Sequence, residues 1–218
     1  MSATTFPRSP KVLKGALVTV ASEGATPSVL AFQYNPGTLT RKLELAAVAD
    51  GGPNAEVQRL MGVPVETINL EAELDATDAL ESGNAQAVEF GLHPQLAALE
   101  ELVYPAASHT RDAQRLLDHG VLEIAPVEGP VTLFVWGARR VLPVKIIEMS
   151  VSEEQFDTNL NPIRAKVTLG LRVLSSNDLP SSHWAYSLFM AHQLGKERLA
   201  NAAPTSSFGV TGATLDTE

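Results

Sequence analysis

The histidines are the first candidates for catalytic or metal-binding residues in this sequence. There are five, and none lies in an H-x-H pair or in the H-E-x-x-H pattern that places two imidazoles on one metal ion. They are His93, His109, His119, His183 and His192. His119 precedes a glycine typical of a helix C-terminus, where the helix dipole favours a cation. We therefore interpret all five as structural or surface residues and expect no metal site.

Two pairs of carboxylates could in principle share general acid–base work. Asp75 and Asp78 are three residues apart, and Glu100 and Glu101 are adjacent. Each pair also fits a simpler role, in a solvated turn or on the outer face of a helix, and we favour that role. The sequence contains no G-x-S-x-G, G-x-G-x-x-G or G-x-x-x-x-G-K-[ST] motif and no cysteine. It therefore predicts no enzyme and no cofactor site.

Composition and charge exclude further classes of function. The 218 residues carry 16 basic and 25 acidic side chains, a net charge of −9, and the longest basic runs are the pairs Arg41-Lys42 and Arg139-Arg140. Such a chain lacks the basic face that binds nucleic acid. No apolar run reaches the ~18 residues of a membrane-spanning helix, and the N-terminus does not resemble a signal peptide. We expect a protein made in the cytoplasm, without nucleic-acid binding or direct membrane insertion.

Most of the predicted elements are β-strands, in which apolar and polar residues alternate with a period of two. This alternation is longest over 163–173 and clear over 66–75, where apolar residues fall on one face and polar ones on the other. Turn signals separate the other strands. The predicted strands span 11–34 (as a hairpin), 38–48, 66–75, 131–136, 140–151 and 163–173. The acidic segment Ser152–Asn161 is predicted as a turn.

Helical spacing is confined to the middle and the end of the chain. One helix is predicted after Pro94, a shorter one over 111–119, and a last one over about 182–200, capped by Ser181 or Ser182. The fold class is therefore α+β, a mainly antiparallel β sandwich or barrel with an inserted helix pair and a C-terminal helix. The expected parts are a flexible arm (1–10), a main domain (11–175), a C-terminal helix (176–200) and a loose tail (201–218).

Four parts of the chain carry motifs in a fixed order. They are Val29–Pro36 (V-L-A-F-Q-Y-N-P), Glu66–Asp75 (E-T-I-N-L-E-A-E-L-D), His93–Leu99 (H-P-Q-L-A-A-L) with Leu133–Gly137 (L-F-V-W-G), and Phe156–Val167 (F-D-T-N-L-N-P-I-R-A-K-V). Residues 11–175 thereby resemble the tube-type inner-baseplate proteins of contractile injection systems, which are phage-tail-like particles. The family signatures at these places read F-x-F/Y-N-P, E-x-L-x-x-x-L-x-x-D, H/P-x-L-x-x-L with F-x-W-G, and F…N/D-G-x-P-x-R-A-x-V.

The resemblance implies a non-enzymatic subunit with the tail-tube fold. Family members lie between the spike hub and the inner tube, so it implies an inner-baseplate or tube-initiating subunit. The implied partners are inner tube subunits, the spike or hub protein, other baseplate proteins, and further copies in a ring of six. The implied location is a particle that assembles in the cytoplasm and can be released. No segment resembles the LysM-like domain that follows the tube domain in many members, so peptidoglycan binding is not carried over.

Five residues of these motifs are expected to determine the fold and not to do chemistry. They are Phe32, Asn35, Pro36, Trp136 and Gly137. Phe32 is expected to point inward, and Asn35-Pro36 to make a required turn. Trp136 has the area of a core anchor.

Two further segments are candidate interfaces. Phe156 is an aromatic residue in the acidic segment 152–161, and it is expected either to contact another subunit or the hub, or to fold onto its own sheet. In the last helix, Trp184 lies on the stripe expected to face the domain, whereas Tyr186 and Phe189 lie off it. We expect a neighbouring subunit to cover those two aromatics. The alternative is a helix enclosed by its own domain.

Other functions stay open at this point. A small-ligand-binding β-barrel or an unrecognised hydrolase is the alternative from another class, and a plain tail-tube or sheath-cap subunit is the alternative within the same particle. Neighbouring genes for sheath, tube, spike and an AAA+ ATPase would favour the particle. A small molecule that co-purifies with the monomer would favour the ligand binder. We also expect the isolated protein to form weak oligomers, because edge strands without proline or lysine along their length can pair with other chains.

Overall fold

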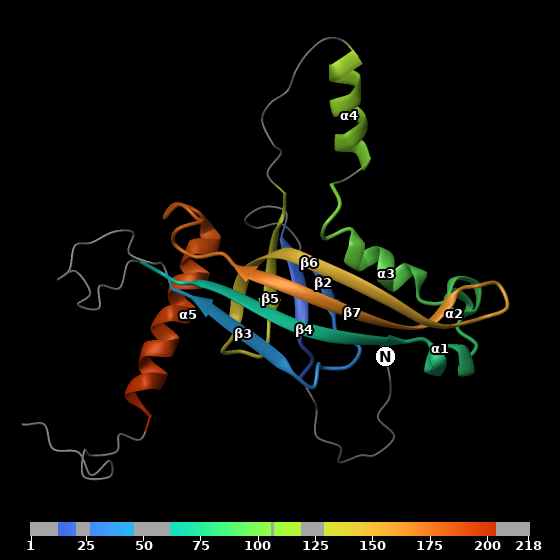
Figure 1. The fold of residues 1–218 in the computed structure, drawn as a ribbon, viewed down its shortest axis with the longest axis horizontal. Coiled ribbons are helices and arrows are strands. Elements are labelled where there is room, and N and C mark those ends of the chain that lie inside the picture. The colour runs from blue at the N-terminus through green and yellow to red at the C-terminus, as the bar shows by residue number, and fades with distance from the viewer. Residues whose placement is uncertain (1–12, 21–26, 46–61, 106, 119–128, 204–218) are drawn as a thin grey trace, which may run out of the picture.

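A computed structural model describes residues 13–20, 27–45, 62–105, 107–118 and 129–203 (Figure 1). Its strands are β1 Ala16–Val20, β2 Ser28–Ala31, β3 Leu39–Glu44, β4 Val65–Asp75, β5 Val131–Val135, β6 Val141–Phe156 and β7 Pro162–Val173. Its helices are α1 Thr77–Glu81, α2 Ala85–Phe90, α3 His93–Glu100, α4 Ala107–Asp118 and α5 Trp184–Asn201. The predicted α+β class, dominated by antiparallel strands, is confirmed.

The strands form one antiparallel sheet in the order β2-β1-β5-β6-β7-β4-β3. The hairpin predicted near the N-terminus is present, with Ala16 of β1 opposite Ala31 of β2 and Thr19 opposite Ser28. In the described part of the chain, β2 and β3 are the two edges and do not pair with each other. The sheet formed by these described strands is therefore open, and they do not form the closed barrel among our expectations.

The longest predicted alternations fall on β4 and β7, which are neighbours in the sheet. On β4, Ile68 and Leu70 are buried and Glu71 is exposed. On β7, Val167 and Leu169 are buried and the residues between and beside them face the other side of the sheet. This alternation holds the register, because a shift of one residue would expose the whole apolar set.

Strand β6 is longer than the sequence predicts. It continues through Phe156, so the first half of the predicted turn Ser152–Asn161 is strand, and the turn is confined to Asp157–Asn161. Within this extension Glu154 pairs across the strands with Lys166, with an N–O distance of 3.3 Å. The acidic residues there mark a solvated strand and not a turn.

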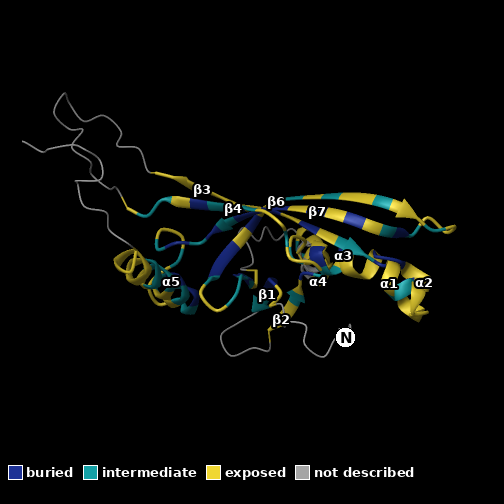
Figure 2. Cartoon of the chain, turned by 90° about the horizontal axis from the view of Figure 1, so that it is seen from below, coloured by how far each residue is buried: buried dark blue, intermediate teal, exposed yellow. Residues whose placement is uncertain are grey.

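The core lies on one side of the long strands β3, β4, β6 and β7. Figure 2 shows α1, α2, α3 and α5, together with β1 and β2, on that side. Strands and helices both contribute buried side chains to one cluster. They include Leu17, Phe32, Ile68, Leu70, Leu96, Leu99, Phe134, Leu142, Val144, Val167, Leu169, Leu171 and Phe189. No described helix covers the opposite side of the long strands.

The middle helices agree with the prediction in part. Helix α3 has Pro94 in its first turn and buries Leu96 and Leu99, as predicted. Helices α1 and α2 were not predicted, and α4 begins at Ala107, earlier than expected. The expected capping glycine Gly120, the N-terminal arm and residues 204–218 of the expected tail lie outside the described residues.

The last helix, α5, begins slightly later than predicted and has a different cap. The cap is His183 and not Ser181 or Ser182, because Nδ1 of His183 accepts a hydrogen bond from the Ala185 N–H at 3.1 Å. The imidazole of His183 also stacks on the ring of Trp184, with centroids 5.7 Å apart.

The side of α5 that faces the domain differs from the prediction. Phe189 is only 4% exposed and belongs to the core cluster, whereas Leu199 on the expected stripe is exposed. The expectation that a neighbouring subunit covers Phe189 is therefore wrong. The physical reason is that α5 packs on β6 through its Ala185 and Phe189 side, which encloses the first half of the helix within its own domain. Trp184 and Tyr186 are half-buried.

Candidate functional site

The segment Phe32–Pro36 after β2, which we call the 32–36 junction, ties together distant parts of the chain. Phe32 is buried, and its N–H donates to the carbonyl of Gly15 at 2.9 Å. Asn35 holds the residues before β1, because its Oδ1 accepts from the Gly15 N–H at 2.9 Å and its Nδ2 donates to the Leu13 carbonyl at 2.8 Å. Pro36 is half-buried behind it.

Trp136 packs against the same junction from the end of β5. Its ring stacks on Phe134, with centroids 5.8 Å apart at 19°, and meets Phe32 at 6.5 Å and 59°. The ring also lies flat against Gly15, where an added Cβ would stand 2.6 Å from it. Next to it, Gly137 has a φ of +74°, a conformation that favours glycine. Close packing therefore accounts for Trp136 and Gly15, and the positive φ accounts for Gly137.

Gln33 was not singled out by the sequence, yet it links the junction to the end of β4. Its Nε2 donates to the Asp75 carbonyl at 2.7 Å, and its Oε1 accepts from the Asp75 N–H at 2.9 Å. The side-chain amide thus pairs with the backbone of β4 as another strand would. This pairing fixes where β4 ends relative to β2.

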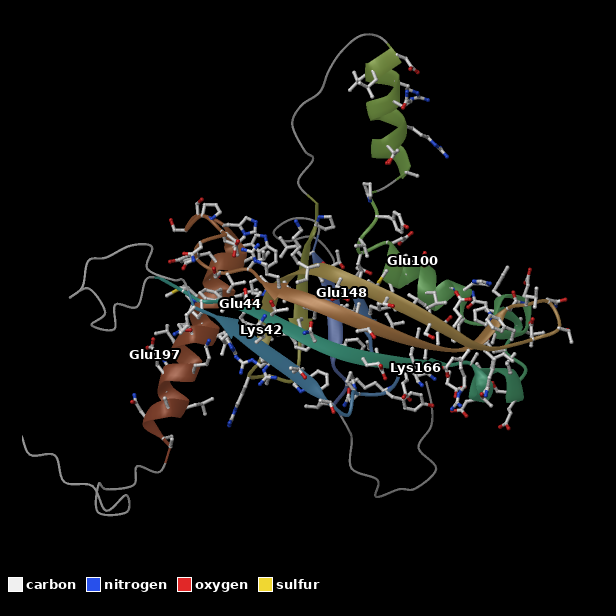
Figure 3. All side chains as sticks on the ribbon, viewed as in Figure 1. Lys42, Glu44, Glu100, Glu148, Lys166 and Glu197 are labelled. Carbon is white, nitrogen blue, oxygen red and sulfur yellow. The ribbon has the colours of Figure 1, made fainter. Side chains whose placement is uncertain are left out.

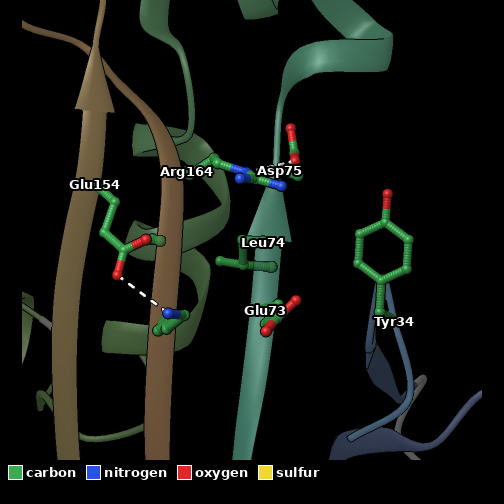
Figure 4. Close-up of a pocket in the computed structure, with 8 residues that line it drawn as sticks. Tyr34, Glu73, Leu74, Asp75, Glu154 and Arg164 are labelled. Atoms are coloured by element: carbon green, nitrogen blue, oxygen red, sulfur yellow. Dashed lines mark hydrogen bonds and ion pairs between the residues drawn. The ribbon is translucent and has the colours of Figure 1, made fainter.

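The carboxylate of Asp75 is part of an ion pair and not of a proton-sharing pair. Figure 4 shows Arg164 reaching it from β7, with Nε to Oδ2 at 2.8 Å. Hydrogen bonds from Thr77, with Arg164 adding to them, lower the pKa of Asp75 below its ordinary value. Asp75 therefore stays ionised at neutral pH, which suits a structural ion pair better than a general acid.

Two shallow hollows adjoin this ion pair. One of about 270 Å³ is polar and lies between Tyr34 and the β4–β7–β6 surface, with Glu73, Glu154 and Lys166 among its walls (Figure 4). The other, of about 410 Å³, lies between the junction and α1 and α3. In the described residues no group of three His, Asp or Glu side chains could hold a metal ion.

The other chemically interesting residues lie apart from this junction. Nδ1 of His192 lies 3.3 Å from the Arg139 carbonyl, and burial lowers the pKa of His192. Arg41 pairs with the buried Glu66 at 2.7 Å, so this basic residue is neutralised within the sheet. Exposed residues at the end of α3 include Glu100 and Glu101, as expected for an outer helix face. His119 lies outside the described residues.

The structure brings residues of all four motif segments together. Phe32 meets Trp136, Gln33 binds Asp75, and Asp75 pairs with Arg164. The predicted interface residue Phe156 lies elsewhere, at the far end of the β6–β7 hairpin, and is 49% exposed. It is neither folded fully onto its own sheet nor covered by described residues.

No family model matches this chain, and no curated protein does either. Within the described ranges, no helix combines the length and apolar character needed to cross a membrane.

Replacing Gln33 with alanine tests the link between the junction and β4. We expect the free energy of unfolding to fall by about 2 kcal/mol, because two hydrogen bonds of about 1 kcal/mol each are lost. The measurement is urea denaturation followed by circular dichroism. Gln95→Ala, at an exposed position of α3, is the control and is expected to change stability by less than about 0.5 kcal/mol. Equal effects of the two variants would contradict a structural role for Gln33.

Proposed function

We propose that this chain is a structural subunit of a contractile injection system, an inner-baseplate or tube-initiating subunit that joins the spike hub to the inner tube. The tail-tube form of the fold is part of this proposal. The observation that carries it is the uncovered polar face of the long strands, on the side opposite the helices (Figure 2).

The uncovered face is formed by the unit β3-β4-β7-β6, and most of its side chains are polar, with Val65 and Ile147 as exposed apolar exceptions. The register places Lys42, Asn69, Glu71, Glu73, Lys145, Glu148, Ser150, Glu154, Arg164, Lys166 and Thr168 on it. Figure 3 shows Lys42, Glu148 and Lys166 along these strands. Ion pairs such as Lys42–Glu44 at 2.7 Å neutralise part of the charge. Such a face suits the lining of an aqueous channel.

A solvent-exposed polar face is common in antiparallel sheets and does not by itself indicate a channel. The free edges of the same four strands add weight to the proposal. Among the described residues, β3 is an edge along its whole length, and β6 has no neighbour on its β5 side from Lys145 onward, because β5 pairs with Val141–Val144. These two edges lie on opposite sides of the unit. Strand pairing between β3 of one copy and β6 of the next would therefore continue the sheet from subunit to subunit around a ring.

Cross-linking between cysteines placed on the two edges tests this pairing. The chain has no cysteine, so Thr40→Cys with Ser150→Cys gives one thiol on each edge and no others. We expect a short bis-maleimide reagent to produce a ladder of covalent products ending at six copies when the protein is co-expressed with its tube and hub partners. The readout is a denaturing gel.

The matched control carries Thr40→Cys with Gln95→Cys, which moves the second thiol to the helix-covered side. This pair is expected to stay monomeric on the gel. A ladder of equal intensity in the control, or no ladder from the edge pair, would contradict the proposed ring.

A further inference from the structure

The larger of the two hollows beside the 32–36 junction has apolar walls, and we call it the α1 hollow. Leu30 of β2, Phe32 of the junction, Leu74 of β4 and Leu99 of α3 line it. Its volume of about 410 Å³ leaves room for an aromatic side chain and the backbone beside it. Leu30 and Leu74 are only half-buried, so an apolar side chain placed in the hollow would remove their remaining surface from water.

The first described residues of the chain lie beside this hollow. Lys14 is one of its lining residues. The residue before it, Leu13, is held in place because Nδ2 of Asn35 donates to its carbonyl at 2.8 Å. Phe6 precedes Leu13 by seven positions, so at ~3.3 Å per residue it can reach points within about 23 Å of Leu13. The α1 hollow is within that reach, since Lys14 itself lines it.

The charges of the two parts are opposite. Residues 1–12 contain Arg8 and Lys11 and no acidic side chain. Segment 75–101, which includes α1, α2 and α3, contains six carboxylates and no lysine or arginine. One of the six, Asp75, is paired with Arg164, whereas Asp78 is exposed in the wall of the hollow. The beginning of the chain is therefore attracted to this side of a molecule whose net charge is −9.

The sequence around Phe6 lowers the entropic cost of binding. Phe6 is followed directly by Pro7, and Pro10 comes three positions later. A proline restricts its own backbone and that of the residue before it, so such a stretch has less conformational freedom to lose when it becomes ordered.

We propose that the α1 hollow is a peptide-binding site and that its ligand is the segment 4–11 of the same chain. Phe6 enters between the apolar walls, and Arg8 lies beside Asp78. Figure 2 shows β2, α1 and α3 on the helix side of the long strands, so an occupied hollow leaves the uncovered face and the edges of β3 and β6 accessible. The contact lies within one chain and does not depend on the proposed function.

Cross-linking within the full-length protein tests this contact. Thr5→Cys with Ala79→Cys gives one thiol beside Phe6 and one in the wall of the hollow on α1, and the chain has no other cysteine. A short bis-maleimide reagent at low protein concentration is expected to close a loop within the chain, which migrates faster on a denaturing gel. Nearness along the chain also favours this product, so the decisive comparison changes the ligand and leaves the two thiols in place.

Phe6→Ser in this two-cysteine protein is expected to slow loop closure about tenfold, because the apolar anchor is lost and the segment spends less time in the hollow. The matched control is Ser9→Ala, in the same segment but without a proposed contact, and it is expected to leave the rate unchanged. Equal rates for Phe6→Ser and Ser9→Ala would overturn the proposal, because chain connectivity alone would then explain the cross-link.

A second variant blocks the hollow instead of altering its ligand. Ala31→Trp places an indole at an exposed position of β2 that lines the hollow, and it is expected to slow loop closure as much as Phe6→Ser does. Circular dichroism checks that this variant is folded. A folded Ala31→Trp variant that closes the loop at the parent rate would show that the segment binds elsewhere and would overturn the proposal.

Mixing two single-cysteine variants tests whether the ligand belongs to the same chain. Thr5→Cys mixed with Ala79→Cys is expected to give no more covalent dimer than Thr5→Cys mixed with Leu199→Cys. Leu199 is exposed on α5, and Figure 1 places α5 and α1 toward opposite ends of the longest axis. An excess of dimer in the first mixture would show that the segment of a second copy occupies the hollow, and the proposal of a contact within one chain would be wrong.

Discussion

Trp136→Ala is expected to lower the free energy of unfolding by about 3–5 kcal/mol, the range found when large aromatics are removed from packed sites. The indole contacts Phe134 and Phe32 and lies so close to Gly15 that a Cβ added there would stand 2.6 Å from the ring, and no smaller side chain fills that space. For a chain of this length the loss corresponds to a fall in melting temperature of about 6–20 °C. Thermal unfolding followed by circular dichroism measures it.

The control for Trp136 is Tyr104→Ala, because Tyr104 is an exposed aromatic beyond α3. We expect it to change stability by about 0.5 kcal/mol or less. Should Trp136→Ala leave the melting temperature unchanged and instead abolish one defined reaction, the enzyme interpretation would replace the structural one.

Phe189→Ala is expected to cost a similar amount, about 3–5 kcal/mol, since Phe189 joins α5 to the core. This is the opposite of what a neighbour-covered aromatic would do, because an exposed residue contributes little to the stability of the isolated chain. Urea denaturation of the isolated protein gives the comparison directly.

Leu199→Ala supplies a control on the same helix, at a position that is exposed. Its stability is expected to stay within about 0.5 kcal/mol of the parent. A larger cost for Leu199→Ala than for Phe189→Ala would mean that α5 presents its other side to the domain.

The strands with one buried face could be predicted from the sequence. In β4 and β7 each second residue meets the core, so Ile68 and Val167 mark the buried side without any knowledge of their partners. Helix α3 was predictable for a related reason, because Pro94 sets its start and leucines at helical spacing mark its buried side. Local chemistry determines these elements.

Contacts between distant residues could not be predicted. Gln33 binds the backbone of Asp75, 42 positions away, and nothing near Gln33 in sequence marks it as a bridging residue. The buried side of α5 was assigned wrongly because its first turns are apolar nearly all round, so Phe189 and Leu188 are equal candidates by periodicity. The end of β6 was missed because charged residues such as Glu154 are neutralised by a cross-strand partner.

Several residues of the candidate site could be predicted from the sequence, but their arrangement in space could not. Phe32 and Trp136 were expected to shape the fold, and they contact each other. Their convergence with Asp75 and Arg164 depends on the pairing of β4 with β7, which sequence periodicity does not specify.

The position of this chain in an electron-microscopy map of the assembled particle tests the central proposal most directly. We expect six copies in one ring between the spike hub and the first ring of the inner tube. The uncovered face of β3, β4, β6 and β7 is expected to line the channel, with the helices outside. Absence of the chain from the particle, or a ring whose helix side lines the channel, would contradict the proposal.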